Sequence, residues 1–85
     1  MRYLVELRPA AARTLRDLHP AARRRVAARI DALSQVPRPA GVKLLAGAER
    51  FCRVRVGDYR IIYQIFDKTP RILVVRIGHR REVYR

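Results

Sequence analysis

Arginines dominate the residues of this chain that can do chemistry, and several recur two positions apart. Arg53 and Arg55 have this spacing, so in an extended strand their side chains point to the same face. Arg60 follows just beyond a Gly-Asp pair and can lie near them across a tight hairpin. Arg76 joins the same face only if the next strand pairs in a suitable register. Guanidinium groups stay protonated and match phosphate oxygens in a bidentate fork, so this cluster predicts binding of a polyanion.

A second group of reactive residues lies in the run GHRREVYR at 78–85. Single-stranded RNA binding needs cations for the phosphates and an aromatic ring on which a base can stack, and this run has both. His79 is the only side chain nearby whose unperturbed pKa is close to neutrality, which makes it a candidate for proton transfer. Tyr84 is open to two interpretations, a residue of the site or a hydrophobic plug against the sheet.

Several other chemistries are disfavoured by what the sequence lacks. Cys52 is the only cysteine, which rules out an internal disulfide, and its place among alternating residues predicts a buried thiol. His19 precedes a proline and is expected at a helix boundary. No second histidine, cysteine or acidic cluster has ligand spacing around His79, so neither a metal nor another cofactor is expected. Asp58 and Glu82 are the only carboxylates near the arginines, which disfavours a paired-carboxylate mechanism.

Net charge is the strongest global feature of the 85-residue chain. Twenty lysines and arginines face seven aspartates and glutamates, a formal net charge of +13. Such a field attracts polyanions, so nucleic acid or an acidic protein is the expected partner. A membrane is disfavoured because no run of about 18 apolar residues is present. The first nine residues are typical of a strand rather than a signal peptide, and a cytoplasmic location is therefore expected.

Hydrophobic periodicity changes from helical to strand-like along the chain. Two helices are expected, from Pro9 to about Leu18 and from Pro20 to about Val36, each starting at a proline. The apolar stripe of the second helix consists of Ala22, Val26, Ile30 and Leu33. Strands are expected over residues 2–7, 51–56, 59–66 and 71–77, with a glycine at 78 closing the last one.

These elements predict a single α+β domain over residues 1–85, in the order β-α-α-β-β-β. A helical hairpin is expected to pack on one face of a mainly antiparallel four-stranded sheet. If Val54 and Val56 face the helices, then Arg53 and Arg55 face solvent on the uncovered side. The sheet would therefore present its arginines on the face away from the helices.

Three segments of the sequence resemble the RelE/ParE toxin superfamily: KLL at 43–45, RVRVGDYRIIY at 53–63 and GHRREVY at 78–84. The resemblance covers nearly all of the chain, because the leading β-α-α order and the length agree as well. It implies a RelE-like fold and the toxin half of a type II toxin–antitoxin pair. RelE members cut mRNA in the ribosomal A site, whereas ParE members share the fold, inhibit DNA gyrase and lack the catalytic set.

The resemblance also indicates which individual residues of this chain match the functional residues of the superfamily. It implies catalytic roles for Arg53, Arg55, Arg60, Arg80 and Tyr84, to which His79 is added for proton transfer. Three further basic residues are expected to bind RNA: Lys43, Arg76 and Arg81. The best-known members have lysine in place of Arg53 and Arg55 and a longer spacing before the final tyrosine. The resemblance therefore leaves open whether Arg80 or Arg81 enters the site.

The implied reaction is attack of a ribose 2′-hydroxyl on the adjacent phosphate, with loss of the 5′-oxygen of the next nucleotide. Preorganised cations stabilise the negative charge of its transition state. The resemblance also implies an acidic, RelB-like antitoxin that wraps the basic surface and that itself binds operator DNA. Direct sequence-specific DNA binding by this chain is not expected. Two alternatives remain at this point: a ParE-like gyrase inhibitor that acts by binding alone, and a non-catalytic RNA- or ribosome-binding module.

Overall fold

The sheet and helices of this chain form the layers that the sequence predicts. The computed structural model describes residues 2–45 and 51–79. Its elements are β1 (Leu4–Leu7), α1 (Pro9–Asp17), α2 (Pro20–Gln35), β2 (Lys43–Leu44), β3 (Phe51–Val56), β4 (Tyr59–Phe66) and β5 (Arg71–His79). The strands lie in the order β1-β5-β4-β3-β2, with β1 parallel to β5 and every other pair antiparallel. The predicted α+β class is confirmed.

The sheet has five strands, whereas the sequence predicted four. The additional strand is β2, in which Lys43 pairs with Arg53 and Leu44 pairs with Cys52. Two residues are too few to show a period of two, so periodicity cannot reveal such a strand. The end of β5 also differs from the prediction. Gly78 does not close the strand, because it and His79 still pair with β4.

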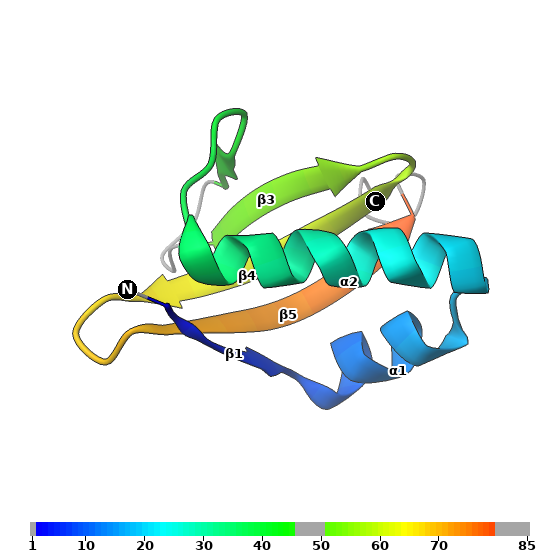
Figure 1. The fold of residues 1–85 in the computed structure, drawn as a ribbon, viewed down its shortest axis with the longest axis horizontal. Coiled ribbons are helices and arrows are strands. Elements are labelled where there is room, and N and C mark those ends of the chain that lie inside the picture. Colours follow the sequence, from blue (N-terminus) through cyan, green and yellow to red (C-terminus); the bar gives the residue numbers. More distant parts are fainter. Residues whose placement is uncertain (1, 46–50, 80–85) are drawn as a thin grey trace.

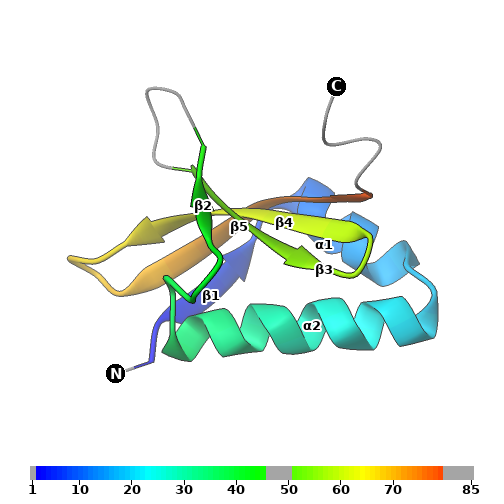
Figure 2. The same cartoon turned by 90° about the horizontal axis from the view of Figure 1, so that it is seen from above.

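Both helices begin at the prolines that the sequence indicated. Pro9 and Pro20 occupy the first turns of α1 and α2, where a missing N–H costs nothing. His19 lies at the boundary as predicted, and its Nδ1 accepts a hydrogen bond from the Ala21 N–H at 3.3 Å. Figure 1 shows α2 running along the sheet, with α1 beside the β5 and β1 side. In the turned view of Figure 2, α2 lies on one side of the sheet, and neither of the two described helices covers the opposite side.

The core lies between α2 and the sheet. The predicted stripe of α2 is buried, and Val26 and Leu33 are fully enclosed. The sheet contributes Ile61, Tyr63, Ile72 and Val74, all at 0% exposure. Fully burying one such side chain contributes about 1.5–3 kcal/mol of transfer free energy, so this layer holds the helices on one face of the sheet. Cys52 is buried as expected, and burial raises the pKa of its thiol.

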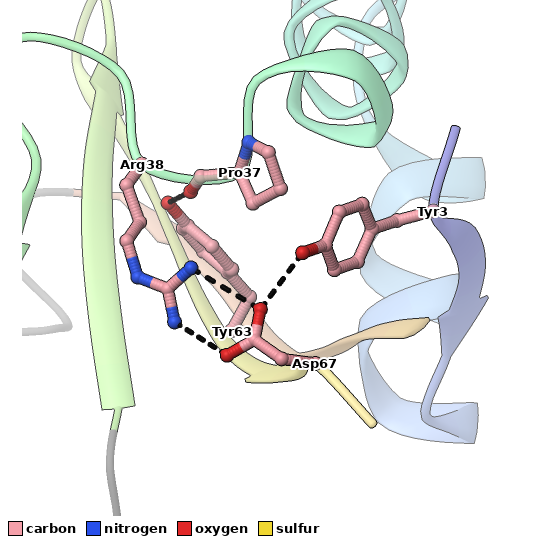
Figure 3. Close-up of polar contacts among 5 residues, drawn as sticks. All are labelled: Tyr3, Pro37, Arg38, Tyr63 and Asp67. Atoms are coloured by element: carbon pink, nitrogen blue, oxygen red, sulfur yellow. Dashed lines mark hydrogen bonds and ion pairs between the residues drawn. The ribbon is translucent and has the colours of Figure 1, made fainter. Parts of the chain in front are cut away.

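A polar network ties the segment after α2 to the far end of the sheet (Figure 3). Arg38 forms a forked ion pair with Asp67, at 2.9 Å from Nη2 to Oδ2 and 3.3 Å from Nη1 to Oδ1. The Tyr3 hydroxyl donates to Asp67 Oδ1 at 2.7 Å, and this hydrogen bond raises the pKa of Tyr3. The Tyr63 hydroxyl donates to the Pro37 carbonyl at 2.7 Å, and burial raises the pKa of Tyr63 to about 12. The segment that leads into β2 is thereby fixed.

Candidate nucleic-acid interface

Four basic side chains come together on the face of the sheet that the helices leave uncovered. Arg55 and Arg60 pair directly across the β3–β4 hairpin, and directly paired residues point to the same face. Arg53 is two residues before Arg55 and therefore shares that face. Lys43 pairs with Arg53 and extends the row into β2. The cluster proposed from residue spacing is therefore present in the fold.

Arg76 joins these four residues because of a β-bulge in β5. Ile62 pairs with Arg76 while Tyr63 pairs with Val74, so Val75 has no counterpart in β4. Strict alternation from the buried Val74 would turn Arg76 toward the helices. The extra residue reverses the alternation, and Arg76 instead lies beside Ile62 on the uncovered face. We call the five residues Lys43, Arg53, Arg55, Arg60 and Arg76 the basic face.

Exposure differs strongly within the basic face. Lys43, Arg55 and Arg76 are exposed, and Arg53 is half-buried. Arg60 is only 2% exposed. Removing a guanidinium from water costs several kcal/mol in proteins, and fixed burial prevents the side chain from reorienting. Arg60 is therefore held in a fixed position opposite Arg55, and Arg55 is the one of the two that solvent and an approaching anion can reach.

The paired carboxylates of the described segments lie away from the basic face. Their ion pairs join Asp31 to Arg2, Asp17 to Arg16, Asp67 to Arg38 and Glu6 to Arg71. Two rows of paired residues make up the basic face. One row runs Lys43, Arg53, Ile62 and Arg76, and the other runs Arg55, Arg60 and Gly78. Neither row contains an acidic residue, and the nearest described carboxylate in the sequence is Asp58, in the turn between β3 and β4.

His79 is not brought to the basic face. It pairs with Tyr59, and the two rings meet edge to face with centroids 5.6 Å apart. His79 and Tyr59 line a pocket of about 460 Å³, and the other lining residues come from α1 and the residue after it: Thr14, Asp17 and Leu18. His79 therefore faces α1. The reason is strand alternation, which puts Gly78 beside Arg60 and turns the next residue to the other side. His79 and the basic face therefore lie on opposite faces of the sheet.

The remaining predicted site residues lie outside the described residues. These are Arg80, Arg81 and Tyr84. Within 2–45 and 51–79, no group of three or more His, Cys, Asp or Glu side chains can hold a metal ion. In the same segments, no helix is long and apolar enough to cross a membrane.

Ile62 is a residue of this face that sequence reasoning missed. It lies between Arg53 of β3 and Arg76 of β5 and is half-buried. The signal that would have found it is its position two residues after Arg60, which predicts a shared face.

Comparison with known proteins agrees with the fold. The sequence model of one family, described as "ParE toxin of type II toxin-antitoxin system, parDE", matches residues 5–84. The chain belongs to this family. A curated relative, Toxin RelG of Mycobacterium tuberculosis, is 32% identical over 74 residues, which are 82% of this chain and 85% of that protein. This ParE-family chain is thus a member of the RelE/ParE superfamily, as the sequence motifs indicated.

Solved structures with RelE folds match this ParE-family chain over nearly its whole length. One is the archaeal RelE–RelB complex from Pyrococcus horikoshii, with a TM-score of 0.82 and 30% identity, covering 94% of this chain and 97% of that one. Another is the toxin–antitoxin complex RelBE2 from Mycobacterium tuberculosis, with a TM-score of 0.78 and 26% identity, covering 93% and 99%. The RelE-like fold predicted from the sequence is confirmed.

Proposed function

We propose that this chain is a ribosome-dependent mRNA endonuclease, the toxin of a type II toxin–antitoxin system. The observation that carries the proposal is the basic face, where Arg60 is buried directly opposite Arg55. The names of the relatives, RelG and RelE, support a RelE-type activity. Such an activity implies that the protein works in the cytoplasm, on mRNA in the ribosomal A site.

The proposed reaction forms a bond between a ribose 2′-oxygen and the adjacent phosphorus. The bond from phosphorus to the 5′-oxygen breaks, which leaves a 2′,3′-cyclic phosphate and a free 5′-hydroxyl. Negative charge grows on the phosphoryl oxygens in between, and Arg55 and Arg60 are suited to stabilise it. Loss of one preorganised donor of this kind typically lowers kcat by about 10²–10³-fold.

Proton transfer is the part of the reaction for which the described residues provide the fewest suitable side chains. A base must take the 2′-hydroxyl proton and an acid must supply one to the departing 5′-oxygen, each step contributing about 10²–10⁴-fold. Arginine stays protonated and is poor at both tasks. His79 faces α1 on the other side of the sheet. We therefore assign proton transfer to Tyr84, with Arg80 as a further cation.

An acidic, RelB-like antitoxin is the proposed protein partner. Both structural relatives described above are toxin–antitoxin complexes, one of them of RelE with RelB, and the net charge of +13 favours association with an acidic chain. Such binding should weaken as salt screens the charges. Neither a membrane nor a specific DNA sequence is a proposed target of this chain.

The proposal is tested by cleavage of mRNA on programmed ribosomes. The Arg55→Gln variant removes one exposed charge of the basic face, and we expect cleavage to slow by about 100-fold with folding unchanged. The matched control is Arg24→Gln, which removes an equally exposed arginine from α2. Wild-type rates for both variants would refute the assignment of the site, and intact mRNA with the wild-type protein would refute the proposed function.

The description of the matching family favours a second candidate function, inhibition of DNA gyrase by binding alone. This activity needs no catalytic residues. A supercoiling assay with purified gyrase separates the two candidates. We expect supercoiling to proceed unchanged in the presence of the protein, and inhibition at stoichiometric concentrations would favour the second candidate.

A further inference from the structure

Apolar side chains border the basic face on the side toward the β4–β5 turn. Ile62 lies within the row of Arg53 and Arg76. In the next row along the sheet, Phe51 pairs with Gln64, and Gln64 pairs with Leu73. We call Phe51, Ile62 and Leu73 the apolar band. All three are half-buried.

The apolar band is not part of the core beneath the helices. The partly buried hydrophobic residues that pack on that core are others, such as Val56 and Ile65, and none of the three band residues is among them. The band lies on the opposite side of the sheet, where Figure 2 shows no helix. A group of apolar side chains on an uncovered face commonly marks an interaction site.

The row beyond the apolar band is arranged differently. There Arg71 pairs with Phe66, and its guanidinium lies 4.6 Å from the centroid of the Phe66 ring. Arg71 also forms an ion pair with Glu6 at 3.3 Å. Glu6 partly neutralises the charge of Arg71, and the basic face lies on the other side of the band.

We propose that the bases of a bound single-stranded RNA lie on the apolar band while its phosphates lie on the basic face, with Ile62 as the central base contact. The proposal rests on the proposed function and names how its substrate is held. Side chains two residues apart in a strand are separated by about 6.7 Å, and neighbouring strands by about 4.8 Å. Adjacent rows therefore offer a cationic surface and an apolar surface within the reach of one nucleotide.

Charge complementarity selects RNA as the occupant. A partner that fits must present anionic groups beside flat apolar ones at a short, regular repeat. Single-stranded RNA does so, and base stacking on protein side chains tolerates sequence variation because every base has an apolar face. The acidic antitoxin is the other chain whose charge fits this surface, and its binding there is an outcome of the test.

The test compares RNA with and without a base at one position. Binding of the full chain to short single-stranded RNAs is measured by fluorescence anisotropy at low salt, with a single abasic ribose moved along the oligonucleotide. At one or two positions we expect the missing base to raise Kd about tenfold for the wild-type protein. Ile62→Thr keeps a β-branched side chain, and we expect it to raise Kd for intact RNA similarly but to abolish the penalty for the missing base.

Two controls separate base contact from charge and from surface change in general. Arg55→Gln should weaken binding of intact and abasic RNA equally and lower the salt dependence by about one phosphate contact. Leu44→Thr removes a 73% exposed leucine from the other face. It should change neither the Kd for intact RNA nor the penalty for the missing base. Circular dichroism reports whether each variant folds, and Ile62→Val serves as a milder second substitution.

Three results would overturn the inference. The first is a wild-type Kd that does not depend on any base. The second is an Ile62→Thr variant that retains the full abasic penalty. The third is an Ile62→Thr variant that binds RNA normally but loses affinity for the antitoxin, which would assign the band to that partner. Cleavage on ribosomes is measured separately, so failure of this inference and failure of the proposed function are distinguishable.

Discussion

The two ends of the sheet use arginine in opposite ways. Near the β4–β5 turn, Arg38 is held by Asp67 through two hydrogen bonds, and the same carboxylate accepts a third from Tyr3. Near the β3–β4 hairpin, Arg55 and Arg60 face each other in a row without an acidic residue. The first arrangement neutralises a charge in order to fix a loop. The second places two arginines side by side across a hairpin, and the proposed phosphate contacts depend on this arrangement.

The comparison shows that arginines of the same type serve structure or binding according to their neighbours. Abundance of arginine alone does not distinguish the two roles. Substitutions at either end should therefore separate an effect on activity from an effect on stability.

The largest effect is expected for Arg60→Met, which removes the buried charge and keeps much of the side-chain volume. Cleavage on programmed ribosomes should fall by about 10²–10³-fold because a preorganised cation is lost. The free energy of unfolding is measured alongside, because a substitution at a side chain that is only 2% exposed can also change stability. Urea unfolding beside the cleavage assay checks both values. A variant that is inactive only because it is unfolded would contradict this assignment.

A smaller effect is expected at the structural end for Tyr63→Phe. The substitution removes the hydrogen bond to the Pro37 carbonyl and should lower the free energy of unfolding by about 1 kcal/mol. Cleavage per folded molecule should be unchanged. An activity loss as large as that of the arginine variants would show that the two ends are not separable.

The pKa of Tyr63 adds a pH dependence to this variant. Folding raises that pKa from 10.0 to about 12, so above pH 10 the unfolded chain loses the phenolic proton before the folded one does. The stability that this group contributes is complete below pH 10 and declines as pH rises toward 12. Wild-type stability should therefore fall more steeply than that of Tyr63→Phe across this range. Parallel curves from urea unfolding at a series of pH values would contradict it.

The smallest effect is expected for Asp67→Asn. Both side chains of the ion pair are more than half exposed, at 56% for Arg38 and 54% for Asp67, and pairs of this kind contribute about 0.2–1 kcal/mol. The loss should shrink further at high salt because the pair is screened. Thermal unfolding at low and high salt measures it. A salt-independent loss would assign the effect to the hydrogen bond from Tyr3 instead.

Sequence reasoning predicted the parts of this fold that local periodicity determines. The stripe of α2 and the proline helix starts follow from spacing, and so does the shared face of Arg53 and Arg55. Arg60 could be placed near them because the hairpin is short.

Other parts depended on pairing that a single strand does not reveal. The bulge at Val75 decides the side of Arg76, and it arises from the match between β4 and β5 rather than from either strand alone. His79 was proposed for proton transfer because arginines follow it in the sequence, and alternation turns its side chain toward α1, away from the basic face. Strand β2 was missed because two residues show no period.

The most direct test of the central claim is primer-extension mapping of cellular mRNA after induction of this chain. We expect new 5′ ends inside codons, in frame along translated messages, and we expect these ends to be lost in the Arg60→Met variant. Uncut messages during growth arrest by the wild-type protein, or cuts that persist in that variant, would contradict it.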